Sequence, residues 1–256
     1  MSKNASALKV KLSSYDELFG ANAPATSDKN QIVNVTLSEL QTFKNHPFHV
    51  NDDKEMEELA ESIREHGVLI PGIVRPRAEG GYELIAGHRR KHGSELAGKT
   101  EMPVIVREYT DDEATIMMVD SNIQRESILP SEKAKAYTLK YEALKHQGKK
   151  SGKSTLDQVG EAAGENSKKV QRYIWLSRLS DQMLQMVDEK RLGFSQGVDL
   201  SFLSKKSQQI VADAIERSKC TVSMGQSAKL KEYEKKNELT STVVRLILEE
   251  KNVHKR

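Results

Sequence analysis

The first third of the chain alternates between the helical and the extended hydrophobic period. A helix is predicted over 52–66, because acidic residues fill its first turn, Gly67 follows its last, and apolar residues recur at helical spacing. Three apolar runs bounded by Gly and Pro then predict short strands at 68–76, 82–86 and 102–108, with a helix at 88–96 between the last two. The pattern predicts a compact α/β domain over 31–110, preceded by a flexible polar arm at 1–30.

After residue 110 only the helical period remains. Thr110 and the acidic residues behind it predict a helix at 111–120, and Pro130 begins another. Further helices are predicted at 155–163, 167–178, 181–190, 204–218, 226–235 and 240–250. The predicted fold class is α+β: a small α/β N-terminal domain followed by an all-helical region, which we divide into 111–205 and 206–256. The apolar stripe of Val243, Val244 and Ile247 fits either a self-association helix or packing within the chain.

The distribution of charged residues along the chain adds to this picture. The chain has 256 residues and a net charge of only +3, but residues 145–180 hold eight Lys/Arg against three acidic residues, a local charge of +5. A clustered basic surface is typical of phosphate binding, although a solvated linker has the same composition. The single cysteine, Cys220, excludes an intrachain disulfide, and no apolar leader or membrane-length run is present, so we expect a cytoplasmic protein without membrane contact.

The segment GKKSGKST at 148–155 resembles the glycine-rich loop that cradles nucleotide phosphates. That loop needs four residues between its two glycines and a preceding buried strand, whereas Gly148 and Gly152 are separated by three residues and follow a predicted helix. We therefore interpret 148–155 as a basic connector.

A better anion site is predicted at the start of the 88–96 helix. Gly87 lets the backbone approach a ligand, the helix start offers unpaired N–H groups, and Arg89 and Arg90 add forked donors. The alternative is that these arginines form salt bridges with acids of the 52–66 helix. A second polar cluster follows the 111–120 helix and consists of Ser121, Asn122, Gln124 and Arg125.

Residues 156–179 fit a helix-turn-helix, and an ordinary helical hairpin is the alternative. Gly160 is small where two helices would cross, Gly164 would form the turn, and Leu156, Val159, Val170, Tyr173 and Ile174 would form the shared core. In this motif the start of the second helix enters the major groove of DNA. The predicted DNA-contacting residues there are Asn166, Ser167, Lys168, Gln171 and Arg172, and Lys169, Lys149, Lys150 and Lys153 would contact phosphate.

Three motifs, in this order and spacing, resemble the ParB/Noc family of partition proteins. They are ELAESIREHGVLIPGIVRP at 58–76, GYELIAGHRR at 81–90, and SNIQRES with LPSEKA within 121–134. The resemblance implies a homodimeric clamp on double-stranded DNA at a centromere-like site, a ParA-type ATPase as partner, location at the nucleoid, and in many members a switch that uses CTP and Mg²⁺.

In the family, the nucleotide site is formed by the second and third motifs. Carried over, the nucleotide-binding residues are Gly87, His88, Arg89, Arg90, Ser121, Asn122, Gln124 and Arg125, with Asn122 also near Mg²⁺. Glutamates of the family motifs are replaced by His88 and Ser121. Because Mg²⁺ prefers carboxylate oxygens, we expect weak or absent CTP hydrolysis and assign no catalytic residue.

Two other functions fit the same elements. A nuclease or small-molecule kinase on this scaffold would need a carboxylate at the phosphate site, for which Glu83 and Glu126 are nearby in sequence. A local transcriptional regulator would use the helix-turn-helix alone, without spreading along DNA.

Overall fold

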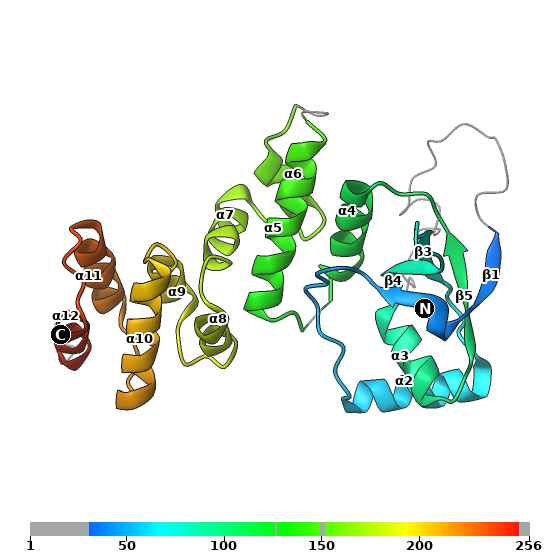
Figure 1. Ribbon diagram of the computed structural model, residues 1–256, viewed down its shortest axis with the longest axis horizontal. Helices are drawn as coiled ribbons and strands as arrows, with labels where there is room; N and C mark the ends of the chain where they lie inside the picture. Colours follow the sequence, from blue (N-terminus) through cyan, green and yellow to red (C-terminus); the bar gives the residue numbers. More distant parts are fainter. Residues whose placement is uncertain (1–30, 126, 149–151, 251–256) are drawn as a thin grey trace, which may run out of the picture.

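The computed structural model describes residues 31–125, 127–148 and 152–250. It is elongated, with the sheet at one end and helices that follow one another toward the C-terminal end (Figure 1). The mixed α+β architecture with a helical C-terminal region confirms the predicted fold class. The flexible arm predicted at 1–30 and the basic residues Lys149 and Lys150 lie outside the described residues.

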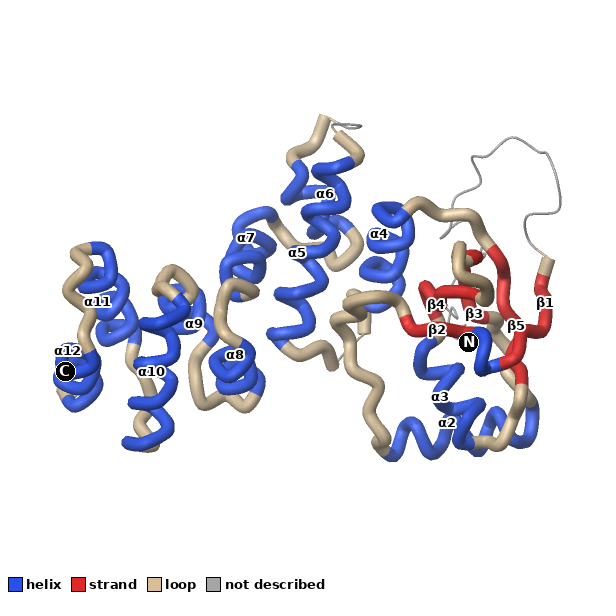
Figure 2. The backbone as a smooth tube through the Cα atoms, viewed as in Figure 1, coloured by secondary structure: helices blue, strands red, loops and turns tan. Residues whose placement is uncertain are grey.

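One curled sheet contains the strands of the described residues (Figure 2). They are β1 (Ile32–Thr36), β2 (Leu40–Thr42), β3 (Gly72–Pro76), β4 (Tyr82–Ala86) and β5 (Glu101–Val106), with a short 3-10 helix, η1 (Leu37–Glu39), between the first two. The order is β1-β5-β3-β4-β2. The β1–β5 and β3–β4 pairs are antiparallel, and the β3–β5 and β2–β4 pairs are parallel.

The three strands predicted from sequence form the centre of this sheet, and both edges were missed. β1 and β2 are short edge strands whose residues are mostly exposed, so neither carries the apolar run of a central strand. The first predicted strand was also too long, because 68–71 precedes β3 as a loop. In that loop Leu69 and Ile70 are 76% and 60% exposed.

Two helices of the N-terminal part are α2 (Lys54–His66) and α3 (His88–Leu96), and they agree with the predicted ranges within two residues. Asp53 caps α2 by accepting a hydrogen bond from the N–H of Met56. Gly93 sits inside α3, and a Cβ there would lie 3.1 Å from Cδ1 of Ile63. Its missing side chain is what lets the two helices approach closely.

The remaining helices form the region after residue 110. They are α4 (Asp111–Asn122), α5 (Pro130–His146), α6 (Thr155–Glu161), α7 (Ser167–Leu176), α8 (Asp181–Asp188), α9 (Phe194–Leu200), α10 (Lys205–Ser218), α11 (Met224–Lys235) and α12 (Ser241–Glu249). Sequence periodicity missed α9, which contains a glycine and spans only seven residues. Val244 and Ile247 of α12 are buried against the chain's own helices, so at least these two positions of the stripe serve internal packing.

The hydrophobic core continues from the sheet into the first helices. Ile73 of β3 and Ile85 of β4 belong to one buried cluster with Met118, Tyr137 and Val170. Neighbouring strand residues such as Val74 and Leu84 face a second cluster inside the curled sheet. A third cluster joins α8 to α12. α4 therefore packs directly on β4, and α5 to α7 join the sheet through α4 and the shared core, which places the two predicted polar motifs near each other.

Candidate nucleotide and nucleic-acid site

The turn from β4 into α3 has the backbone geometry that a phosphate site requires. Gly87 adopts a φ of 113°, in the left-handed region that side chains rarely enter, and it is the residue before the first turn of α3. A Cβ on Gly87 would also lie 3.2 Å from Cα of Gly72. Glycine is thus required here for conformation and for space, and the N–H groups at the start of α3 face away from any intrahelical acceptor.

The two arginines of this turn have different partners. The Arg89 guanidinium lies 3.4 Å from Asp53 Oδ1 and 3.7 Å from Glu55 Oε2, and its hydrogen bond holds the pKa of Asp53 below its usual value. Arg90 donates to the backbone carbonyls of Ile70 and Pro71 at 2.7 and 2.6 Å. The salt-bridge alternative therefore describes Arg89, whereas Arg90 holds the exposed loop before β3.

His88 is turned inward from the same turn. Its ring stacks on that of His46, from the loop after β2, with 3.9 Å between ring centroids. Burial, then the charges of His46, Lys91, Arg90 and Arg125, lower the pKa of His88 to about 3. Sequence inspection assigned no role to His46, and no local pattern links it to His88.

The second polar motif brings one cation to this histidine pair. The charge of Arg125 lowers the pKa of both His46 and His88, which shows that the two motifs converge. Ser121 and Asn122 instead donate to the carbonyl of Met118 at 3.0 and 2.8 Å. Gln124 donates to the carbonyl of Ala162 at 3.0 Å, so it joins this motif to the end of α6.

The described residues provide a poor Mg²⁺ site. Asn122 offers one amide oxygen, and the described part of the chain holds no group of three His, Cys, Asp or Glu side chains placed to bind a metal. Mg²⁺ at phosphates is usually held by one or two carboxylates. Glu83 cannot supply one, because its side chain is buried against Arg75 at 2.6 Å and accepts from the N–H of Lys44. Glu126 lies outside the described residues.

α6 and α7 form a tight helix pair. A Cβ on Gly160 would lie only 2.2 Å from the carbonyl oxygen of Glu165 and 2.9 Å from Cγ2 of Val170, so the helices cross where glycine leaves room. Gly164 adopts a φ of 63° in the turn. Val159 and Val170 are buried, and Leu156, Tyr173 and Ile174 pack around them as the spacing predicted.

Most of the polar residues at the start of α7 are held by the protein itself. Asn166 caps the helix, Ser167 hydrogen-bonds Asp157, and Lys169 lies 2.7 Å from Glu165. Arg172 donates to Ser195 Oγ at 2.6 Å, and its guanidinium lies 5.0 Å from the ring centre of Phe194 on α9. Lys153 pairs with Glu161 at 2.6 Å. Lys168 is exposed and Gln171 half-buried, and neither forms a hydrogen bond or ion pair within the described chain.

A buried polar cluster that the sequence did not reveal anchors the turn between α6 and α7. The carboxylate of Glu165 is 8% exposed and accepts from Lys133 at 2.7 Å and from the hydroxyl of Tyr137 at 2.9 Å, besides Lys169. Burial raises the pKa of Glu165, but the hydrogen bonds from Lys133, Lys169 and Tyr137 outweigh it, so the pKa is lowered. The cluster ties the turn to α5.

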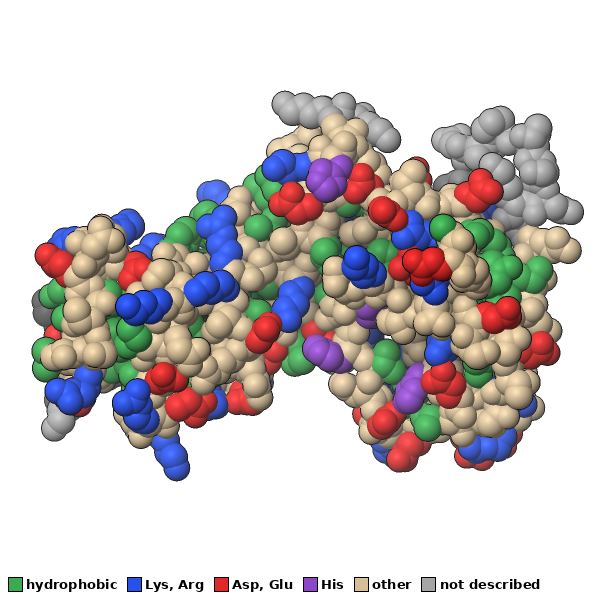
Figure 3. Space-filling view, in the orientation of Figure 1, with side chains coloured by type: hydrophobic (Ala, Val, Ile, Leu, Met, Phe, Trp, Pro, Cys, Tyr) green, Lys and Arg blue, Asp and Glu red, His purple; other side chains and the backbone are tan. Residues whose placement is uncertain are grey.

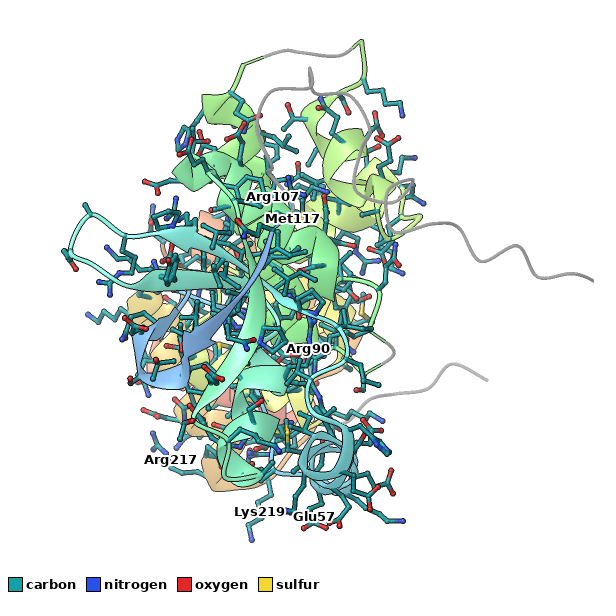
Figure 4. The ribbon with its side chains drawn as sticks, turned by 90° about the vertical axis from the view of Figure 1, so that its right-hand side faces the viewer. Glu57, Arg90, Arg107, Met117, Arg217 and Lys219 are labelled. Atoms are coloured by element: carbon teal, nitrogen blue, oxygen red, sulfur yellow. The ribbon has the colours of Figure 1, made fainter. Side chains whose placement is uncertain are left out.

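Figure 4 shows the N-terminal part from its end, with Arg90 between Glu57 of α2 below and Met117 of α4 above. α3 thus starts where the sheet meets the helical region.

Across the described ranges, no helix is both long and apolar enough to cross a membrane.

Comparison with known proteins finds a family model and several relatives that are similar to part of the chain. Residues 21–123 match the model of the ParB N-terminal domain. A protein of Deinococcus radiodurans named as a probable chromosome 1-partitioning protein ParB is 35% identical over 165 residues, which cover 64% of this chain and 54% of that protein. The chain spans about half the length of the first curated relatives it matches.

Two solved structures are also similar. Both are C-terminally truncated ParB from Caulobacter crescentus. The one complexed to the centromeric parS site is 21% identical with a TM-score of 0.48, over 78% of this chain and 98% of the other. The one complexed with CTP-γ-S is 24% identical with a TM-score of 0.35, over 73% and 99%. Residues 21–123 are therefore similar to the ParB N-terminal domain, and the curated relatives that the chain matches are named as partition proteins.

Proposed function

We propose that the chain is a sequence-specific DNA-binding protein of the partition type, which binds double-stranded DNA through α7. The observation that carries the proposal is the tight α6–α7 crossing at Gly160, which presents the start of α7 as a helix-turn-helix does. Lys168 and Gln171 lie there and form no hydrogen bond or ion pair with any other described residue. Lys and Arg side chains also gather over the helical region in Figure 3. The names of the curated relatives support a role in partition.

The contacts within the protein refine which residues would read DNA. Gln171 can pair with adenine and Lys168 with guanine or phosphate, without breaking a contact within the chain. Arg172 would have to leave Ser195, and Lys169 would have to leave Glu165. A homodimeric clamp and a ParA-type ATPase partner belong to the same proposal, and they rest on the similarity of the chain to ParB proteins.

Genome-wide DNA occupancy tests this proposal. We expect few peaks, each with broad shoulders from spreading, and we expect the double variant Lys168→Ala/Gln171→Ala to lose them. Lys206→Ala is the matched control, because it removes a positive charge from an exposed position on α10. Narrow peaks would favour a local transcriptional regulator, and the absence of any sequence-specific enrichment would contradict DNA reading by α7.

We also propose that the Gly87 turn binds the triphosphate of CTP, without efficient hydrolysis. The strained glycine, the start of α3 and Arg90 support phosphate binding. The replacement of family glutamates by His88 and Ser121, with the poor Mg²⁺ site, supports slow hydrolysis.

Calorimetric titration with CTP and Mg²⁺, followed by a phosphate-release assay, measures the two parts separately. We expect saturable binding of CTP and phosphate release near the rate of a protein-free blank. Ser121→Glu restores a carboxylate and is expected to raise the rate, whereas Ser127→Glu places the same charge on an exposed residue and should not. Brisk release by the unaltered protein would contradict the loss of hydrolysis.

A further inference from the structure

The stacked pair of His46 and His88 has two polar atoms without partners. Nε2 of each ring is shielded from solvent and makes no hydrogen bond to any of the described residues. Leaving a buried polar atom unpaired is unfavourable, so a ligand that satisfies both would be favoured here.

The protonation of His46 follows from its other nitrogen. Nδ1 lies 2.8 Å from the carbonyl oxygen of Phe48, and a carbonyl can only accept, so Nδ1 carries the hydrogen. In the neutral ring Nε2 is then a bare lone pair. It can bind a cation, accept a hydrogen bond, or take up a proton and become a donor.

The charges around the pair decide among these ligands. Arg90 and Lys91 approach from α3 and Arg125 from the segment after α4, and all three oppose a positive charge on His88. On the side of α5 the acidic residue is Glu132, which also accepts hydrogen bonds from the backbone N–H and ring Nδ1 of His49. Three cations facing one carboxylate repel a free metal ion and attract an anion, which would also offset the charge of an added proton.

We propose that His46 and His88 together bind a phosphate oxyanion and one proton, which enters from solvent as the ligand binds. The proton adds to one ring Nε2, and the resulting N–H donates to a phosphate oxygen, while no other bond forms or breaks. A single proton is taken up, because two charged rings 3.9 Å apart would repel each other. The inference rests on the proposed nucleotide binding in one respect only, namely that the bound phosphate belongs to CTP.

The sign of the pH dependence follows from linkage. Without ligand, burial first, and then neighbouring charges, keep the pKa of His88 at about 3 and that of His46 below its usual value, so both rings are neutral near neutral pH. A bound phosphate raises the pKa of the pair. Affinity is therefore strongest at low pH. It falls by up to about tenfold for each pH unit between the pKa of the pair in the free protein and its higher pKa in the complex, and it is constant above that pKa.

Titration calorimetry of the full chain tests this between pH 5.5 and 8, in buffers with different ionisation enthalpies. The probes are CTP and inorganic tripolyphosphate, both without metal. We expect the wild-type protein to take up about one proton more per bound ligand than His88→Gln and His46→Gln. The phosphate itself can also take up protons, but this contribution is the same for all variants and cancels when their proton uptake is compared. His66→Gln, an exposed histidine at the end of α2, is the control and should behave as the wild type.

The imidazole signals in nuclear magnetic resonance spectra give a readout that does not depend on affinity. We expect the pKa of one of the two rings to rise when either probe is added. Proton uptake with tripolyphosphate but no binding of CTP would support phosphate binding by the two histidines and contradict CTP as the nucleotide. Binding of CTP with unchanged imidazole signals would overturn the pair but leave nucleotide binding intact. Binding of Zn²⁺ alone at the two rings, or binding of neither probe, would also overturn it.

Discussion

Replacing Gly160 by alanine is expected to destabilise the helical region by about 2 kcal/mol or more and to lower DNA affinity at least tenfold. The added Cβ would lie 2.2 Å from the carbonyl oxygen of Glu165 and 2.9 Å from Cγ2 of Val170, closer than carbon atoms approach in folded proteins. The backbone cannot yield freely, because the N–H of Glu165 donates to the carbonyl of Gly160 at 3.0 Å. α7 would have to move away from α6.

Gly152→Ala is the matched control for this prediction. A Cβ at Gly152 has no atom within 4 Å, so the same chemical change should leave both stability and DNA binding almost unaltered. Urea denaturation and a DNA-binding titration at fixed salt measure the two effects. If Gly160→Ala bound DNA as tightly as the control, α6 and α7 would not act as a helix-turn-helix.

Glu165→Gln is expected to cost about 2–3 kcal/mol of unfolding free energy, the upper range for hydrogen bonds to a charged group. The substitution keeps the size of the side chain but removes the charge that Lys133 and Lys169 face, and it leaves one acceptor oxygen where Tyr137 also needs one. Lys133 is only 17% exposed, so solvent compensates little. The turn before α7 should loosen first.

Glu161→Gln separates the effect of burial from that of pairing. Glu161 lies 2.6 Å from Lys153, but the two side chains are 61% and 58% exposed, so its loss should change the free energy of unfolding far less than Glu165→Gln does. Denaturation of both variants beside the wild type gives the comparison. Equal effects would contradict the buried anchor at Glu165.

At low pH, the difference in unfolding free energy between the wild type and Glu165→Gln should become smaller. Burial raises the pKa of Glu165, but Lys133, Lys169 and Tyr137 lower it further, so the folded carboxyl titrates below its usual value. Its stabilising contribution is full above the pKa of the unfolded chain and is lost as the pH falls through the pKa of the folded protein. A gap that stayed constant between pH 7 and pH 3 would argue against a charged Glu165 in the folded state.

The sequence predicted the features whose cause lies within a few residues. The glycine turns at Gly87 and Gly164 depend on neighbouring backbone groups, so residue type and spacing suffice to locate them. The same holds for the long amphipathic helices. The α6–α7 pair was predicted with its core because all its positions lie in one short segment.

The missed elements are those that packing decides. β2 spans three residues and is fixed by pairing with β4, far along the chain. α9 contains Gly197, a weak helix former, but a Cβ there would lie 2.9 Å from Leu176 and 3.1 Å from Val187, so glycine is needed for close contact with α7 and α8. Local propensity cannot reveal a requirement that other helices impose.

The candidate site also combines features that local sequence fixes with features that packing decides. By itself, the sequence determined a glycine before a helix, two arginines beside it and a helix pair with a basic first turn. Only the tertiary structure decided that Arg89 pairs with α2, that Gln124 reaches the end of α6, that Glu165 is buried against α5 and that His46 stacks on His88. Local hydrogen bonding and backbone conformation fix the first group. The second depends on which distant side chains the core brings together and shields from water.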